Sequence, residues 1–125
     1  MTPARTAIAI VEAFHLTCLR VLERRYDRAK YVVKGGVNIR AWFASRRYSE
    51  DMDIDAIAGT PHVLETAFDK IVAGKDMEML LAHQGISIDR MTKPKQTDTT
   101  QRWKFELRAD ESAELVRTKG EFSWR

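Results

Sequence analysis

The chain has 125 residues, of which 44% are hydrophobic and 31% are charged, which is enough for one domain with an apolar core. The net charge is +3, but residues 1–50 carry ten basic and four acidic side chains, whereas residues 51–90 carry three and eight. A single cysteine, Cys18, excludes a disulfide within the chain and a cysteine-based zinc site, and no apolar run is long enough to span a membrane. These features favour a cytoplasmic protein without membrane contact, and an acidic segment beside basic ones suits a polyanionic ligand.

The N-terminal segment predicts a helix that ends near Arg25. Thr2-Pro3 is typical of an N-cap followed by proline at the first helical position. Val11, His15 and Leu22 then recur on one face at helical spacing. We expect His15 to pack inside rather than bind a metal, and Cys18 to fill a small space in the core.

Residues 31–55, YVVKGGVNIRAWFASRRYSEDMDID, predict a strand, a glycine turn, a short helix and an acidic strand. The strands would cover Tyr31–Val33 and Asp51 to about Ala56, with the short helix between them at Val37–Ser45. A glycine pair lets backbone N–H groups approach a phosphate closely, and a helix that begins there directs its positive end at the anion. Asp51 and Asp53 would share one face of their strand, where two carboxylates offer the hard oxygen ligands that Mg²⁺ prefers.

The remaining chain predicts two helices followed by three strands. Thr60-Pro61 starts a helix that runs to Val72 and stops at Gly74, and a second helical piece, Asp76–His83, ends at Gly85. The strands form an antiparallel meander, with a polar turn at Lys93–Thr100, and cover Ile86–Met91, Gln101–Leu107 and Leu115–Trp124.

Two-metal transfer usually relies on a third carboxylate that reaches across from a neighbouring strand, and two residues qualify. Glu121 lies on the polar face of the last strand, and Glu106 lies on the polar face of the strand before it. Alternation alone leaves both open, and either one is also explained as a surface residue paired with lysine.

The KGG motif, followed by RRYSEDMDID, resembles the AbiEii/AbiGii-type nucleotidyltransferases, the toxins of type IV toxin–antitoxin pairs within the polymerase-β-like superfamily. The C-terminal RTKGEFSWR resembles the strand that carries the third acid in part of this family, which favours Glu121 over Glu106. The resemblance implies an α+β fold, with a mixed, mostly antiparallel sheet and helices packed mainly on one face.

The resemblance also implies a Mg²⁺-dependent transfer of a nucleotidyl group from a nucleoside triphosphate to a hydroxyl on tRNA or protein. Asp51, Asp53 and Glu121 would be catalytic and would hold the metal. Lys34, Gly35, Gly36 and Arg47 would bind the phosphates, and Ser49 would bond a phosphate or cap the turn. A cognate antitoxin is the implied protein partner.

The sequence departs from the family pattern in two ways. Val37 stands where members often have Thr or Ser, so it offers no hydroxyl to a phosphate. We also expect residues 1–125 to form only the nucleotidyltransferase core, without the helical C-terminal region of the family. The alternative hypothesis is a non-catalytic module with the same fold that binds nucleic acid or a partner through its basic flanks. The base of the nucleotide, the acceptor and the oligomeric state stay open.

Overall fold

The structure is a computed structural model that describes residues 5–33 and 51–124. In these residues five strands form one sheet in the order β1-β2-β5-β4-β3. Their bounds are Tyr31–Val33 for β1, Met52–Ala56 for β2, Ile86–Gln96 for β3, Thr100–Ala109 for β4 and Val116–Trp124 for β5. β2 and β5 pair in parallel, and the other neighbours pair antiparallel. The predicted α+β fold with a mixed, mostly antiparallel sheet is confirmed.

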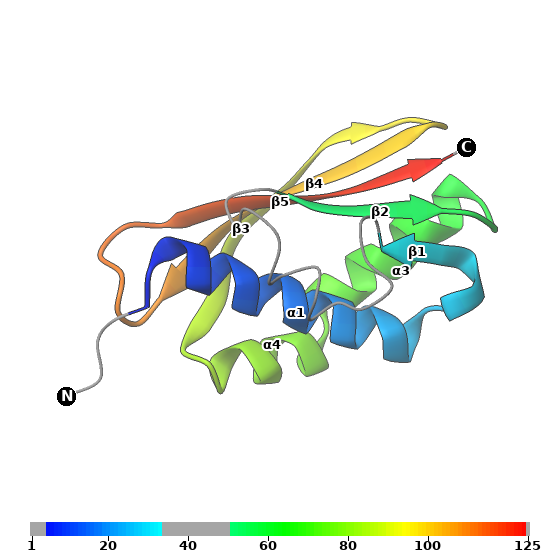
Figure 1. Cartoon of the computed structure of the whole chain (residues 1–125). Helices are drawn as coiled ribbons and strands as arrows, with labels where there is room; N and C mark the ends of the chain where they lie inside the picture. Colours follow the sequence, from blue (N-terminus) through cyan, green and yellow to red (C-terminus); the bar gives the residue numbers. More distant parts are fainter. Residues whose placement is uncertain (1–4, 34–50, 125) are drawn as a thin grey trace.

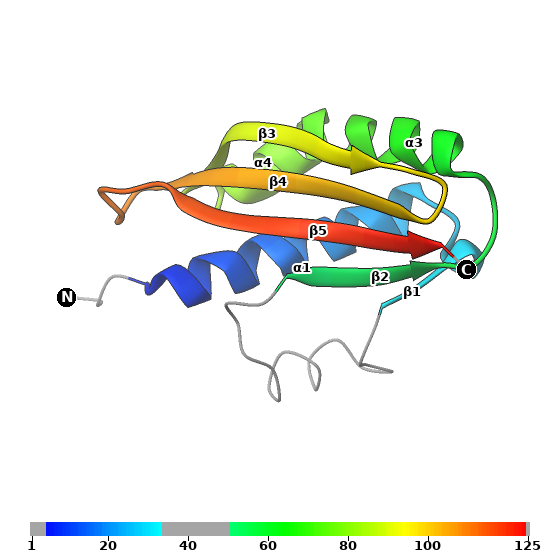
Figure 2. The same cartoon turned by 90° about the horizontal axis from the view of Figure 1, so that it is seen from above.

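Helices cover one face of this sheet. They are α1 at Ala7–Arg25, α3 at Pro61–Ala73 and α4 at Lys75–Ala82, with a short 3₁₀ turn, η1, at Arg28–Lys30. Figure 1 shows all three α-helices on the same side of the strands, and Figure 2 shows the sheet with the helices behind it. No helix within the two described ranges is both long and apolar enough to cross a membrane.

Threonine caps fix where α1 and α3 begin. The Thr6 hydroxyl accepts a hydrogen bond from the Ala9 N–H at 3.2 Å, so α1 begins at Ala7 and not at Pro3 as predicted. Thr2, the predicted cap, lies outside the described residues. Thr60 caps α3 in the same way, with Pro61 at the first position and Gly74 at the end, as predicted.

β3 runs to Gln96, so the prediction of a turn that starts at Lys93 is wrong. The C-terminal part of β3 is polar because β3 lies at the edge of the sheet. Pro94 has no backbone N–H to donate, which an edge strand tolerates because only one of its sides is paired. Lys93 is engaged with Glu65 and Asp69 of α3 rather than with a turn. The actual hairpin is closed by the Thr97 N–H, which donates to the Thr100 carbonyl at 2.9 Å.

The core lies between the helices and the sheet. Met52, Ile54 and Phe122 are fully buried on the helical face of β2 and β5. Phe68 of α3 packs edge-on against Trp103 of β4, with ring centroids 4.6 Å apart. Since these residues alternate with polar ones, the opposite face of the same strands carries polar and charged side chains.

Candidate active site

The acidic strand presents its carboxylates on the sheet face opposite the helices. In β2 the side chains of Met52, Ile54 and Ala56 are buried, while those of Asp53 and Asp55 are half-buried. Asp51 directly precedes the strand and continues the alternation. A strand that buries every second residue therefore directs its aspartates to the uncovered face of the sheet.

Glu121 lies directly beside Asp53. The two residues are register partners in the parallel pair β2–β5. The neighbours of Glu121, Gly120 and Phe122, are buried toward the helices, so the glutamate faces the same way as Asp53. Adjacent strands lie about 4.8 Å apart, a separation at which two side chains can share one ion.

Glu106 occupies a different position on the same face. It lies on β4, which β5 separates from β2, and its register partner is Arg117. Its carboxylate is 3.8 Å from the Arg90 guanidinium and 3.7 Å from that of Arg117. The sheet thus places Glu121, and not Glu106, on the strand adjacent to Asp53.

Two of the acids are held by cations from neighbouring strands. Lys119 Nζ lies 3.2 Å from an Asp51 carboxylate oxygen, and Arg102 Nε donates to Glu121 Oε2 at 2.8 Å. All four side chains keep between about a quarter and a third of their surface exposed, so these ion pairs remain within reach of solvent. The cations neutralise the carboxylates, a role that a bound metal would take over.

Three carboxylates on the uncovered face of the sheet have the chemistry that a hard divalent cation requires. Asp51, Asp53 and Glu121 offer carboxylate oxygens, which are the ligands that Mg²⁺ accepts. Within the described part of the chain, however, no three or more His, Cys, Asp or Glu side chains come together in a group that could hold a metal ion. Loading would therefore require Lys119 and Arg102 to release the carboxylates that they hold.

A shallow cavity of about 480 Å³ adjoins Asp51 on the same side. Lys104 and Lys119, which face each other across β4 and β5, both line it. Like charges directly opposite in a sheet repel, so an anion that lies between them would be stabilised. The charged lining comprises Asp51, Glu106, Arg90, Lys104, Arg117 and Lys119.

The sequence interpretation did not assign the basic residues Arg102, Lys104 and Lys119 to the site. The alternation of β4 and β5 shows that Lys104 and Lys119 share a face with the acids. Which base reaches which acid depends on the pairing of β2 with β5, and no local pattern carries that information. The predicted phosphate-binding residues, Lys34, Gly35, Gly36, Arg47 and Ser49, lie outside the described residues.

His15 packs inside, as the sequence predicted. Its Nε2 lies 2.8 Å from the Thr118 hydroxyl of β5, and its ring is almost fully buried. Burial lowers the pKa of His15 to about 4, because the charged imidazolium would lose its hydration. Cys18 is likewise buried, and desolvation raises the pKa of its thiol.

The fold is shared with two solved structures. The first is JHP933 from Helicobacter pylori, with 19% identity and a TM-score of 0.59, over 99% of this chain and 46% of that one. The second is described as a "putative nucleotidyltransferase from H. pylori", with 21% identity and a TM-score of 0.56, over 89% of this chain and 44% of that one. At these identities the likeness shows the fold alone, and this chain spans less than half the length of either protein.

Sequence comparison identifies the family. None of the curated proteins matches the chain. Residues 18–120 match the family described as "Nucleotidyl transferase AbiEii toxin, Type IV TA system". The match includes Asp51 and Asp53 and ends one residue before Glu121, so the position of Glu121 rests on the sheet geometry. The predicted resemblance is confirmed: the chain belongs to the AbiEii nucleotidyl transferase toxin family of type IV toxin–antitoxin systems.

Proposed function

We propose that this chain is the nucleotidyltransferase core of a toxin, which transfers a nucleotidyl group from a nucleoside triphosphate to a hydroxyl on tRNA or protein. The observation that carries the proposal is the register of Asp53 with Glu121 across a parallel strand pair, on the face that the helices leave uncovered. Family membership supports the same reaction class.

In this proposal Asp51, Asp53 and Glu121 hold Mg²⁺. The bound metal supplies positive charge that stabilises the phosphate oxygens during transfer. The acceptor oxygen forms a bond to the α-phosphorus, the bond from that phosphorus to the β-phosphate oxygen breaks, and pyrophosphate leaves. Glu121 takes the proton of the acceptor hydroxyl. Catalysis of this kind is mainly positioning and charge stabilisation.

The phosphates would contact residues outside and inside the described part of the chain. Lys34, Gly35, Gly36 and Arg47 are proposed to bind the triphosphate, with Ser49 bonded to a phosphate or capping the turn. The cavity beside Asp51 adds cations that suit a polyanionic substrate, since Lys104 and Lys119 face each other there.

The setting of the reaction is also part of the proposal. We place the protein in the cytoplasm, where nucleoside triphosphates and Mg²⁺ are available, and we propose a cognate antitoxin as its partner because the family is defined by toxin–antitoxin pairs. Residues 1–125 would act as one core domain.

A transfer assay tests the reaction. The chain is incubated with Mg²⁺, total tRNA or protein, and each triphosphate in turn, labelled at either the α- or the γ-phosphate. Nucleotidyl transfer places only the α-label on the acceptor. Asp53→Asn should abolish this labelling and Mg²⁺-dependent triphosphate binding, whereas Asp98→Asn, in the exposed β3–β4 turn, should retain both. Full triphosphate binding by Asp53→Asn would show that the site is wrongly placed.

A second function is favoured by the ion pairs themselves. Lys119 with Asp51 and Arg102 with Glu121 already balance the acids without a metal. A non-catalytic module with this fold could bind nucleic acid through the basic cavity without a metal ion. Metal dependence separates the two functions, because such a module would bind RNA equally well in Mg²⁺ and in EDTA at matched ionic strength.

A further inference from the structure

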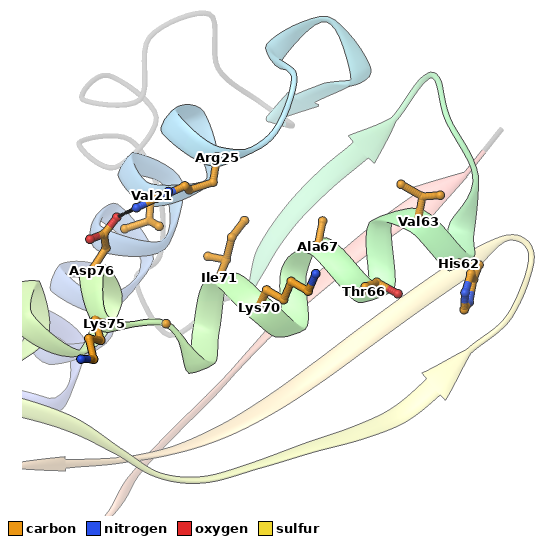
Figure 3. Close-up of a pocket in the computed structure, with 11 residues that line it drawn as sticks. Val21, Arg25, His62, Val63, Thr66, Ala67, Lys70, Ile71, Lys75 and Asp76 are labelled. Atoms are coloured by element: carbon orange, nitrogen blue, oxygen red, sulfur yellow. Dashed lines mark hydrogen bonds and ion pairs between the residues drawn. The ribbon is translucent and has the colours of Figure 1, made fainter.

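A groove of about 690 Å³ lies among the three helices, and so on the side of the sheet opposite the carboxylates. Figure 3 shows its lining side chains, which come from α1, α3 and the first turn of α4. On α3 the lining follows one helical face from His62 to Ile71, and Gly74 continues it just past the end of the helix. Nine helical steps rise about 14 Å, so the groove has the length of a helix of about two and a half turns.

The floor of the groove is apolar. Val21 of α1 and Ile71 of α3 are almost fully buried at its base, and the half-buried Ala67 lies one turn before Ile71 on α3. Val63, at one end, leaves 49% of its surface exposed to water. A partner that fills the groove would remove this apolar surface from water, which is the main favourable term in association.

The rim of the groove is basic. Lys70 and Lys75 stand at its edge in Figure 3, and neither makes an ion pair with the described residues. The acid in the lining, Asp76, is already bonded to Arg25, whose Nε donates to it at 3.1 Å. The rim therefore carries uncompensated positive charge above an apolar floor.

We propose that this groove is a docking site for an acidic amphipathic helix of a partner protein. Such a helix would cover Val63 and Ala67 with its apolar stripe and place its flanking glutamates beside Lys70 and Lys75. Ridges on the partner would enter the channel between α1 and α3, as in other helix-in-groove complexes. The site is independent of the proposed transferase activity, because it lies on the other side of the sheet.

Amide NMR with a designed peptide tests the proposal. The probe is a capped peptide of about 16 residues, with leucine at positions i, i+3, i+4 and i+7 and glutamate on the flanks. A scrambled peptide of the same composition, with no apolar face, is the control. We expect the probe alone to shift the amide signals of Val21, Ala67 and Ile71. Equal shifts with the scrambled peptide would overturn the proposal.

Variants assign the binding to the groove. The double variant Lys70→Glu, Lys75→Glu should bind the probe peptide at least about tenfold more weakly, since two attractive contacts become repulsive. Ala67→Glu should abolish binding by placing a charge on the floor. Lys95→Glu, an exposed lysine on β3, is the matched control and should bind like the parent. Circular dichroism shows whether each variant is folded.

Two results would overturn the proposal. One is unchanged probe affinity in the folded Lys70→Glu, Lys75→Glu double variant. The other is a dimer in sedimentation velocity that Ala67→Glu dissociates, because the groove would then be filled by a second copy of this chain rather than by a partner helix.

Discussion

At the scale of single residues, the two candidate third acids are separated by one strand. Glu121 on β5 is the register partner of Asp53. Glu106 lies one strand further away, on β4, where its register partner is Arg117 of β5. In the proposed mechanism Glu121 is both a metal ligand and the proton acceptor, so Glu121→Gln should lower kcat for nucleotidyl transfer by at least about a hundredfold. Glu106→Gln should leave the rate close to that of the parent. The α-label assay measures both, and the reverse order would identify Glu106 as the third acid.

His15 makes folding stability depend on pH. Its pKa is lowered to about 4 in the folded chain, below the value near 6.5 of an exposed histidine, so unfolding below pH 6.5 takes up a proton. The stabilisation is complete above about pH 6.5 and is lost as the pH falls toward 4, by at most about 3 kcal/mol. Urea unfolding at pH 7 and pH 4.5 should show this loss.

His15→Gln is the matched variant, because the amide can still bond the Thr118 hydroxyl but does not titrate. The difference in unfolding free energy between pH 7 and pH 4.5 should shrink in this variant. An unchanged difference would assign the pH dependence to other groups.

At the scale of elements, the sequence predicted the features that neighbouring residues determine, such as helix ends and the buried face of a strand. Thr60, Pro61 and Gly74 bound α3, and the alternation of Trp103, Phe105 and Leu107 identified the buried face of β4. The extension of β3 through Pro94 escaped prediction because an edge strand tolerates residues that otherwise mark a turn. The start of α1 was misplaced because Thr2-Pro3 fits the N-cap pattern, whereas the cap is Thr6, whose hydroxyl accepts from the Ala9 N–H.

The joint between α4 and β3 depends on Gly85. This residue has a φ of +70°, and a Cβ there would lie 2.7 Å from Oδ2 of Asp110. Gly85→Ala should therefore lower the unfolding free energy by about 1–3 kcal/mol. Thermal unfolding measures the loss. In the background of Asp110→Ala the collision is absent and only the cost of the backbone conformation remains, so a smaller loss is expected there.

At the scale of the whole molecule, the candidate site exists only because β5 returns to lie parallel to β2. Asp53 and Glu121 are far apart in the chain, and their strands are predicted separately by alternation. Their adjacency is a property of the closed sheet, and so are the contacts of Lys119 with Asp51 and of Arg102 with Glu121. The alternation thus predicted which face each acid and each base occupies, but it contained no local signal for which cation holds which acid.

The core and the candidate site are linked at Phe122, which follows Glu121 and is fully buried on the other face. Its ring packs against Phe68 at 5.1 Å and Trp103 at 5.7 Å between centroids. Phe122→Ala should lower the unfolding free energy by about 3–5 kcal/mol through lost contacts and a cavity. Urea unfolding followed by tryptophan fluorescence measures this cost. Phe122→Leu, which retains most of the volume, should cost less.

The same variants separate the fold from the site. Ligands that bind only the folded chain raise its melting temperature. Mg²⁺ with a triphosphate should therefore raise the melting temperature of Phe122→Ala by about as much as that of the parent, since the carboxylates remain on their strands. Asp53→Asn should melt near the parent without ligand but gain nothing when ligand is added. If Phe122→Ala loses the ligand response while still folded at low temperature, the position of Glu121 depends on core packing rather than on strand pairing alone.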